Sequence, residues 1–306
     1  MKVSLVATVK DARPYLEEFL ASVRAQSRRP DEVVVVDGGS IDGTWEVLRE
    51  APGILALFEP GANIARGRNL AIRAAAHDVV AVTDADCVLD PHWLARIVEP
   101  IERGAAVSAG FYRPLGQSFL QACAGAVSLP EHDELRPGWM PSSRSLAMRR
   151  EAFEAAGGYP EWLDVGEDMY LNHRLVEQGA RFELAPEAAT HWRMRSSLGS
   201  TWRQYAAYAE GDALAGMYPN RHAIRFGAYA FAAFALLSRR RWPRVLAAAG
   251  ALAYARRPLR RAQRRLPAGS FQRRAAWAAV PAMMAFIDGA KMWGYVRGLV
   301  SSGRRA

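Results

Sequence analysis

Three apolar runs in the first third of the chain limit the fold more than any other feature of the sequence. They are VSLVATV (3–9), EVVVVD (32–37) and DVVAVTDAD (78–86), and a shorter run, ILALF (54–58), lies between the last two. The runs are continuous rather than alternating, as in strands that are covered on both faces of a sheet. Amphipathic stretches follow them at 13–26, 44–50, 64–76 and from Pro91 onward. This alternation predicts an α/β fold with a doubly wound parallel sheet.

The regular alternation ends near residue 105. The later segments are predicted as a strand at 105–112, a small-residue helix at 117–128, a strand at 145–150, a helix at 167–178 and two short strands around 181–191. Ligands of open α/β sheets gather at the carboxyl ends of the strands. We therefore expect this part of the chain to lie over the edge of the sheet where a ligand binds.

Charge divides the chain near residue 222. Residues 223–306 hold 17 lysines and arginines and one acid, Asp288, for a net charge of +16, whereas residues 1–222 carry −7. This split predicts an acidic body and a basic helical region. A basic region of this kind can meet an anionic membrane or nucleic acid.

Uncharged blocks alternate with arginine clusters in the basic region. The blocks are residues 226–237, 245–255 and 275–287, and each is shorter than the roughly 20 residues of a membrane-spanning helix. We expect interfacial or re-entrant helices whose arginines contact anionic headgroups. A helical subdomain packed on the body is the alternative. Nucleic acid is not an expected partner, because the arginines alternate with Ala-rich blocks instead of forming one polar basic face.

Composition narrows the class of protein. Half of the residues are hydrophobic and 23% are charged, which excludes a disordered chain. Two cysteines, Cys87 and Cys123, are too few and too far apart for a disulfide framework or a cysteine metal site, so a reducing compartment is expected. The first apolar run is too short for the hydrophobic segment of a secretory signal.

Asp84-Ala85-Asp86 brings two carboxylates to the carboxyl edge of the predicted sheet. Mg²⁺ and Mn²⁺ prefer hard oxygen ligands and usually share their coordination with substrate phosphates. The pair can therefore hold a metal that neutralises a departing pyrophosphate. A D-x-D triplet also occurs by chance, as a solvated pair in a loop.

The second apolar run ends in Asp37 and is followed by GGSIDGT (38–44). Glycines there allow the backbone to approach a ligand closely. Asp37 can accept hydrogen bonds from a base or a ribose. Asp42-Gly43-Thr44 is also suited to capping the next helix. The two interpretations use different residues, so both can hold.

Gly166-Glu167-Asp168 begins a predicted helix. Acids in a first helical turn often only complement the helix dipole. In the functional interpretation, Asp168 is a general base that deprotonates an acceptor hydroxyl. His191 ends a predicted strand within ATHWRMR, where an imidazole is either structural or a third metal ligand.

Together these segments resemble the family 2 glycosyltransferases, inverting enzymes of the GT-A fold. The matching pieces occur in order between residues 3 and 216: ATVKDARPYLEEFLASVRAQSRRPDEVVVVDGGSIDGT, GANIARGRNLAIRAA, VVAVTDADC, LAMRREAFEAAGGYPEW, VGEDMYLNHRLVEQGARF and ATHWRMR. The tail phrase FIDGAKMWGYVRGLV is similar to the C-terminal ends of some membrane-associated members. The resemblance implies a GT-A domain over 1–222, with a nucleotide-sugar half at about 1–104 and an acceptor half at about 105–222, and a mostly parallel sheet flanked by helices.

The resemblance also implies the donor-binding residues. Thr8 and Asp37 stand where the family contacts the nucleotide base and ribose, and Arg68 lies in the stretch that runs near the donor. Asp84 and Asp86 match the metal and donor motif, with Asp86 as the more direct ligand.

Further roles follow from the later motifs. Asp168 matches the catalytic base, and His191 matches a position that approaches the metal or the diphosphate in some relatives. Glu167, Arg193 and Arg195 are candidates for contacts with the diphosphate or the acceptor. The arginines suit bidentate phosphate contacts, and surface ion pairs are the alternative.

One position departs from the family pattern. An asparagine commonly follows the first strand, whereas the matching residue here is Asp11, preceded by Lys10. This difference weakens the expectation that the loop contacts the donor, and it does not affect the metal or base assignments.

The implied function is the transfer of a sugar, with inversion, from a UDP-, GDP- or dTDP-linked donor to a hydroxyl acceptor with the help of Mg²⁺ or Mn²⁺. The acceptor would be a lipid-linked glycan, in cell-envelope polysaccharide or glycolipid synthesis on the cytoplasmic side of the membrane. One alternative is a nucleotidyltransferase, but the loop ATVKDARP lacks that class's glycines. The other is an inactive scaffold that binds glycan or membrane. Against it, Asp37, Asp84, Asp86 and Asp168 are all present.

Overall fold

The computed structural model describes residues 1–116, 118–136 and 138–302, and the chain divides into two compact units. The first unit comprises Met1–Arg113 and His132–Arg193, and the second comprises Pro114–Glu131 and Met194–Ala306. The expected boundary after residue 222 falls inside a helix of the second unit, α9 (Pro219–Leu237).

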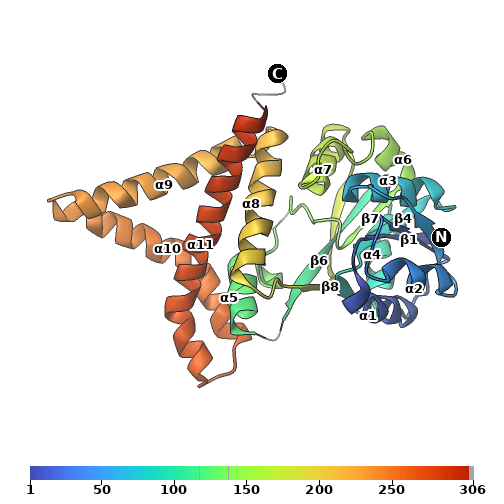
Figure 1. Ribbon diagram of the computed structural model, residues 1–306, viewed down its shortest axis with the longest axis horizontal. Helices are drawn as coiled ribbons and strands as arrows, with labels where there is room; N and C mark the ends of the chain where they lie inside the picture. Colours follow the sequence, from blue (N-terminus) through green and yellow to red (C-terminus); the bar gives the residue numbers. More distant parts are fainter. Residues whose placement is uncertain (117, 137, 303–306) are drawn as a thin grey trace. The chain divides into compact units, whose positions relative to one another are not determined.

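The first unit alternates strands and helices along most of its length (Figure 1). Its elements are β1 (Val3–Val9), α1 (Arg13–Arg24), β2 (Glu32–Asp37), α2 (Thr44–Glu50), β3 (Leu55–Phe58), α3 (Ile64–Ala74), β4 (Val79–Asp84), β5 (Cys87–Leu89), α4 (Trp93–Glu102), β6 (Val107–Leu115), a 3₁₀ turn (His132–Glu134), β7 (Leu146–Arg149), α6 (Arg150–Ala155), α7 (Glu167–Glu177) and β8 (Phe182–Arg193). The last two residues of β6 continue into the second unit.

The strands form one sheet in the order β3-β2-β1-β4-β7-β6-β8-β5 within the described residues. β3, β2, β1 and β4 are parallel, and β7 pairs antiparallel with both β4 and β6. The predicted α/β fold is confirmed. Two details were wrong. The run predicted as one strand turns after Asp84 into a separate short strand, and the two strands expected around 181–191 are one continuous strand, β8.

Apolar cores cover both faces of this sheet. Along β1, Leu5 and Ala7 pack on one face with residues of α1, α2 and α4. Val6 packs on the other face with residues of α3, α6 and α7. Burial on both faces is the reason that β1, β2 and β4 read as continuous apolar runs rather than alternating ones.

The second unit is helical in its described part. It contains α5 (Phe119–Ser128), α8 (Leu198–Leu214), α9, α10 (Arg241–Arg265) and α11 (Phe271–Ser302). The small-residue helix predicted at 117–128 is α5, and residue 117 lies outside the described residues. No helix in the described residues is both long and apolar enough to cross a membrane.

Glycine allows two of these helices to pack backbone to backbone. A Cβ atom at Gly294 of α11 would lie 1.9 Å from the backbone oxygen of Ala206 in α8. Nearer the start of α11, Asp288 is buried and accepts hydrogen bonds from Arg225, Tyr229 and Tyr254 at 2.9, 3.1 and 3.0 Å. The one acid of residues 223–306 therefore connects α9 and α10 to α11.

Large apolar side chains remain exposed where α9 and α10 meet. Leu237 is 86% exposed at the end of α9, and Trp242 is 52% exposed at the start of α10. Phe234, Leu236, Val245 and Leu246 are also exposed, and arginines occupy positions 239–241 and 244. We call residues 234–246 the hairpin tip.

Candidate active site

The carboxyl ends of the parallel strands bring the predicted donor residues to one edge of the sheet. In the strand register, Thr8 of β1 stands beside Asp84 of β4, and Val9 stands beside Asp37 of β2. The fold therefore brings Thr8, Asp37 and Asp84 together on three neighbouring strands, although they lie far apart in the sequence.

Asp37 is fully buried, and its two carboxylate oxygens differ. Oδ1 accepts hydrogen bonds from the backbone N–H groups of Gly39 and Ser40, at 2.8 and 2.7 Å. Oδ2 is buried and has no hydrogen-bond partner among the described residues. A buried carboxylate oxygen without a donor is unfavourable, so this atom suits the N–H or O–H groups of a ligand.

The loops after β1 and β2 are joined by their own side chains. Asp11 has a left-handed backbone (φ 49°), and its Oδ1 accepts the N–H of Ile41 at 3.0 Å. Asp tolerates this conformation better than most residues, as Asn does, which explains an acidic residue at the position where the family has asparagine. Asp42 accepts the N–H groups of Thr44 and Arg13, at 3.0 Å each, so it fixes the start of α2 and holds it to the neighbouring loop.

Helix α3 approaches the sheet closely at Gly67. A Cβ atom there would lie 2.7 Å from Cγ2 of Thr8, so a larger residue would push α3 away from β1. The next residue, Arg68, consequently reaches under the sheet edge, and its side chain is only 2% exposed.

Arg68 joins two carboxylates from distant parts of the chain. Its Nη2 lies 2.5 Å from Oδ1 of Asp84, and its Nη1 lies 2.5 Å from Oε1 of Glu167 at the start of α7. Burial opposes the charge of Arg68, but Asp84 and Glu167 outweigh it and raise its pKa. Burial also opposes the charge of Asp84, and Arg68 followed by Arg144 holds the pKa of Asp84 below its usual value.

For Glu167, unlike Asp84, the effects that favour the neutral carboxyl outweigh those that favour the charged one. Burial, followed by repulsion from Asp168, raises the pKa of Glu167 to about 7 in spite of Arg68. Glu167 is buried and accepts a hydrogen bond from Arg68, and its predicted contact with the diphosphate or the acceptor stays a prediction.

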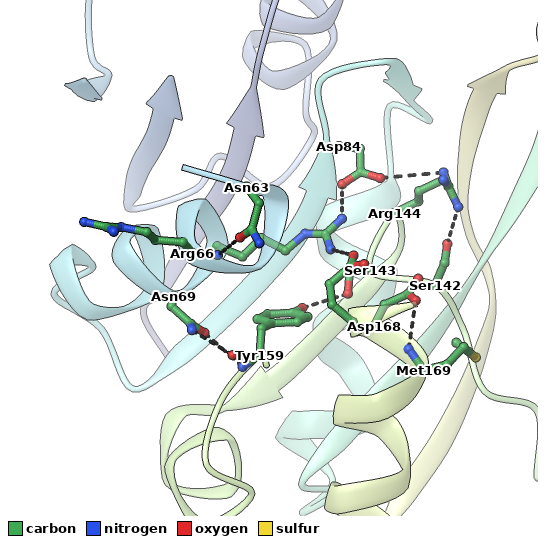
Figure 2. A network of polar contacts seen from close by, with 12 residues as sticks. Asn63, Arg66, Asn69, Asp84, Ser142, Ser143, Arg144, Tyr159, Asp168 and Met169 are labelled. Carbon is green, nitrogen blue, oxygen red and sulfur yellow. Dashed lines mark hydrogen bonds and ion pairs between the residues drawn. The ribbon is translucent and has the colours of Figure 1, made fainter. Parts of the chain in front are cut away.

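Asp168, the predicted base, is partly exposed in the first turn of α7. Its charge contributes to the pKa shifts of Arg68, Glu167 and Tyr159, so it lies within electrostatic reach of all three. Figure 2 shows it in the same network as Asp84. The structure therefore brings the predicted base and the first aspartate of the D-x-D motif to one site.

Asp86 lies in the turn between β4 and β5. Its Oδ2 accepts the indole N–H of Trp192 at 3.2 Å. The guanidinium of Arg144 stacks on the same indole, 4.2 Å from the ring centroid, and its Nε lies 3.6 Å from Oδ2 of Asp84 (Figure 2). Trp192 and Arg144 thus join the two aspartates of the motif through one stack of side chains.

The structure does not bring His191 to the aspartate pair. Side chains alternate along a strand, so His191 projects from the face of β8 opposite Trp192, which contacts Asp86. Burial, followed by repulsion from Arg113, lowers the pKa of His191. Within the described residues, no three His, Cys, Asp or Glu side chains converge as a ready-made metal site.

Of the two arginines predicted after His191, Arg193 donates its backbone N–H to the backbone oxygen of Asp86 at 3.3 Å, but its side chain turns to α1. Arg193 forms an ion pair with Glu18 and lies over the ring of Tyr15, both in α1. Arg195 is exposed and belongs to the second unit. Surface pairing, the alternative considered for these residues, therefore describes Arg193.

The chemistry of the site nevertheless fits a divalent cation. The charged side chains gathered here are four acids, Asp84, Asp86, Glu167 and Asp168, and two arginines, Arg68 and Arg144. This excess of carboxylates offers hard oxygen ligands and residual negative charge, as Mg²⁺ and Mn²⁺ require. These ions are commonly bound by one or two carboxylates plus substrate phosphates, so two aspartates are enough.

Arg144, in the segment SSRS between two elements, was not identified from the sequence. From the sequence, Trp192 could stack on a sugar ring, as could Trp139 and Trp162, or be a core or rim residue, and its contact with Asp86 was not predicted. Arg144 lies in the turn just before β7, which pairs with the strand that ends in Asp84, and its Nε lies 3.6 Å from Oδ2 of that aspartate.

Two models of glycosyl transferase families match the sequence of this chain. A sequence model of glycosyl transferase family 2 matches residues 4–126, and one of glycosyl transferase family 21 matches residues 68–302. The chain is 30% identical to the succinoglycan biosynthesis protein ExoA of Rhizobium meliloti over 199 residues, 59% of each protein. It is 28% identical to the O-antigen biosynthesis protein RfbC of Myxococcus xanthus over 241 residues, 68% of this chain and 19% of RfbC. The matches thus span less than two thirds of the length of these relatives.

Among solved structures, the mannosyltransferase PcManGT of Pyrobaculum calidifontis, in complex with GDP-Man and Mn²⁺, is similar with a TM-score of 0.62. The similarity covers 95% of this chain and 87% of PcManGT. At 22% identity it concerns the fold, and it confirms the prediction of a GT-A fold.

Proposed function

The chain belongs to the family 2 and family 21 glycosyltransferases, and we propose that it transfers a sugar from a nucleotide-diphosphate donor to a hydroxyl acceptor with inversion. The observation that carries this proposal is the meeting of Asp37, Asp84, Asp86 and Asp168 at one edge of the sheet. Relatives named for succinoglycan and O-antigen biosynthesis support a role in cell-envelope polysaccharide synthesis.

The nucleoside is bound between the loops that follow β1 and β2. Asp37 Oδ2 accepts a hydrogen bond from the base or ribose, and Thr8 lines the same edge. Uridine, guanosine and thymidine all offer such donors. The loop itself is held by Asp11 and Asp42, so it is preorganised to receive a nucleoside.

Asp86, assisted by Asp84, would hold the metal, and His191 is a weaker candidate because it projects from the opposite face of β8. When bound, Mg²⁺ or Mn²⁺ would supply the positive charge that stabilises a departing diphosphate. Asp168 accepts the proton of the acceptor hydroxyl as the oxygen attacks the anomeric carbon. Arg68 bonds both Asp84 and Glu167, and it thereby fixes α7, which carries the base, to the end of β4.

Binding of nucleoside diphosphates tests this assignment without requiring the acceptor. Calorimetry with UDP, GDP and dTDP, each with Mn²⁺ and with EDTA, should show metal-dependent binding of one of them. Asp86→Ala should abolish the metal-dependent part, because it removes the principal ligand. Unchanged affinity in that variant would refute the ligand role of Asp86.

The second unit supports an anionic membrane surface as a partner. The hairpin tip exposes leucine, phenylalanine and tryptophan side chains next to four arginines. Apolar side chains beside cationic ones suit the interface of an anionic bilayer, where the former enter the acyl boundary and the latter meet headgroups. A peripheral position on the cytoplasmic side would bring the enzyme to a lipid-linked acceptor.

A further inference from the structure

Arg144 is the cation at the sheet edge that has not been given a role. It lies in the turn just before β7 with its Nε 3.6 Å from Oδ2 of Asp84, and its side chain is 17% exposed. By contrast, Arg68 is 2% exposed and is held at 2.5 Å by two carboxylates. Arg144 is therefore the arginine of the pair that a ligand can reach.

The contacts of Arg144 orient its guanidinium. The group stacks on the indole of Trp192, and Nη1 donates to Oγ of Ser142 at 2.9 Å. These two contacts fix the plane of the group at the site. Its separation from Asp84, 3.6 Å, is an ion pair too long for a hydrogen bond, whereas Arg68 holds the same carboxylate at 2.5 Å. Asp84 thus remains held if Arg144 turns to another anion.

The position of this guanidinium defines the kind of anion it would meet. Trp192 bonds to Asp86, so Arg144 is linked through one indole to the carboxylate assigned to the metal. A diphosphate bound to that metal would lie beside Arg144. Guanidinium groups bind phosphate oxygens in a bidentate manner, and such charge-assisted bonds are about twice as strong as neutral ones.

We propose that Arg144, oriented by Trp192 and Ser142, binds the diphosphate of the nucleotide-sugar donor. The inference rests on the proposed function, because it takes the substrate to be a nucleoside diphosphate sugar. It replaces Arg193 and Arg195 as the arginine contact at the leaving group. The guanidinium contacts the diphosphate directly, in addition to the contact that the metal would make.

The test compares nucleoside diphosphate and monophosphate binding in the full chain, with UDP and UMP, GDP and GMP, and dTDP and dTMP as probes. For the pair that wild type binds, Arg144→Met should weaken diphosphate binding about tenfold or more and change monophosphate binding much less. The loss should persist in EDTA. Arg144→Lys should be intermediate, since it keeps the charge and loses the fork. Arg103→Met, which breaks an exposed pair with Glu183 at the far end of α4, is the matched control and should match wild type.

Each contrary outcome has a distinct meaning. Equal losses for diphosphate and monophosphate, or a loss that vanishes in EDTA, would mean that Arg144 acts through Asp84, and the inference would be overturned. Wild-type affinity in Arg144→Met, together with loss in Asp86→Ala, would overturn the inference and leave the proposed function standing. Absence of binding of every probe to wild type would overturn both. Thermal melts of Arg144→Met and Arg144→Lys establish that both variants are folded.

Discussion

At the scale of single residues, ion pairs between buried side chains hold the site together. Arg68 bonds Asp84 and Glu167 under the sheet edge, and Asp168 adds a further carboxylate to the group. An arginine with two carboxylates is costly to bury unless every partner is present, and removal of one partner leaves an uncompensated charge. Substitution of any one of these charged residues should therefore destabilise the cluster that positions the donor residues.

The base assignment predicts a specific kinetic loss. Asp168→Asn keeps the shape of the side chain and removes its ability to accept a proton, so the rate of sugar transfer should fall by about 10²–10⁴-fold. Calorimetry should show nearly unchanged binding of the nucleoside diphosphate. Glu177→Gln, at the other end of α7, is the control and should transfer at the wild-type rate. Near-normal transfer by Asp168→Asn would disprove the base role.

The raised pKa of Glu167 predicts that the free energy of unfolding depends on pH. Its pKa is raised from 4.5 to about 7 by burial, followed by Asp168, so the folded protein holds this proton more tightly than the unfolded chain. Its ionisation should therefore cost stability as the pH rises from about 4.5 to 7. Denaturant unfolding across this range should show wild type losing stability relative to Glu167→Gln, with a constant difference above pH 7. A constant difference throughout would contradict the shifted pKa.

At the scale of helices and strands, the sequence predicts most of the first unit because burial on both sheet faces leaves a clear pattern. β1, β2 and β4 are continuous apolar runs, and α2 and α7 begin at the predicted residues. β8 was divided in the prediction because polar residues and Pro186 interrupt its apolar character. Pairing with neighbouring strands, which a single sequence does not display, joins it into one strand and brings Trp192 to Asp86.

The residues of the candidate site also divide into those that the sequence predicts and those that it does not. Asp37, Asp84, Asp86 and Asp168 could be identified because they end strands or begin a helix within recognisable motifs. Trp192 is placed by the antiparallel pairing of β5 with β8 and Arg144 by a turn before β7, so their contacts join separate segments and no local pattern indicates them. Side-chain direction likewise decides that His191 faces away from the aspartates.

Two glycine substitutions, one at the contact of α8 with α11 and one outside it, should change the stability in opposite directions. Gly294→Ala would bring a Cβ atom to 1.9 Å from the Ala206 oxygen, so it should destabilise the second unit by about 1–3 kcal/mol. Gly250→Ala, in α10, meets nothing within 4 Å and should stabilise by about 0.5–1 kcal/mol through helix propensity. Denaturant unfolding measures both. Equal effects would show that the two helices are not packed backbone to backbone.

At the scale of the whole molecule, two units of different character share one chain. The first carries the acidic residues of the site, and the second combines helices, arginines and exposed apolar side chains. The predicted split of charge is therefore accompanied by a split of surface chemistry, with exposed apolar side chains and arginines gathered at the hairpin tip of the second unit.

Variants of the hairpin tip test whether the protein binds membranes. Wild type should float with liposomes that contain anionic lipid, resist salt extraction and be released by detergent. Leu237→Glu combined with Trp242→Glu should weaken flotation strongly, since both place carboxylates where apolar side chains would enter the bilayer. Ile41→Glu alters an equally exposed apolar residue in the first unit and should float as wild type does. Unaltered flotation of the double variant would contradict a lipid-binding tip.

The most direct test of the central claim is donor turnover. Purified protein with Mn²⁺, a panel of UDP-, GDP- and dTDP-sugars and a membrane-lipid extract is assayed for released nucleoside diphosphate, with Asp86→Ala in parallel. Metal-dependent release from one donor, lost in the variant, is expected. Release that is equal in the variant, or no release and no binding with any donor, would contradict it.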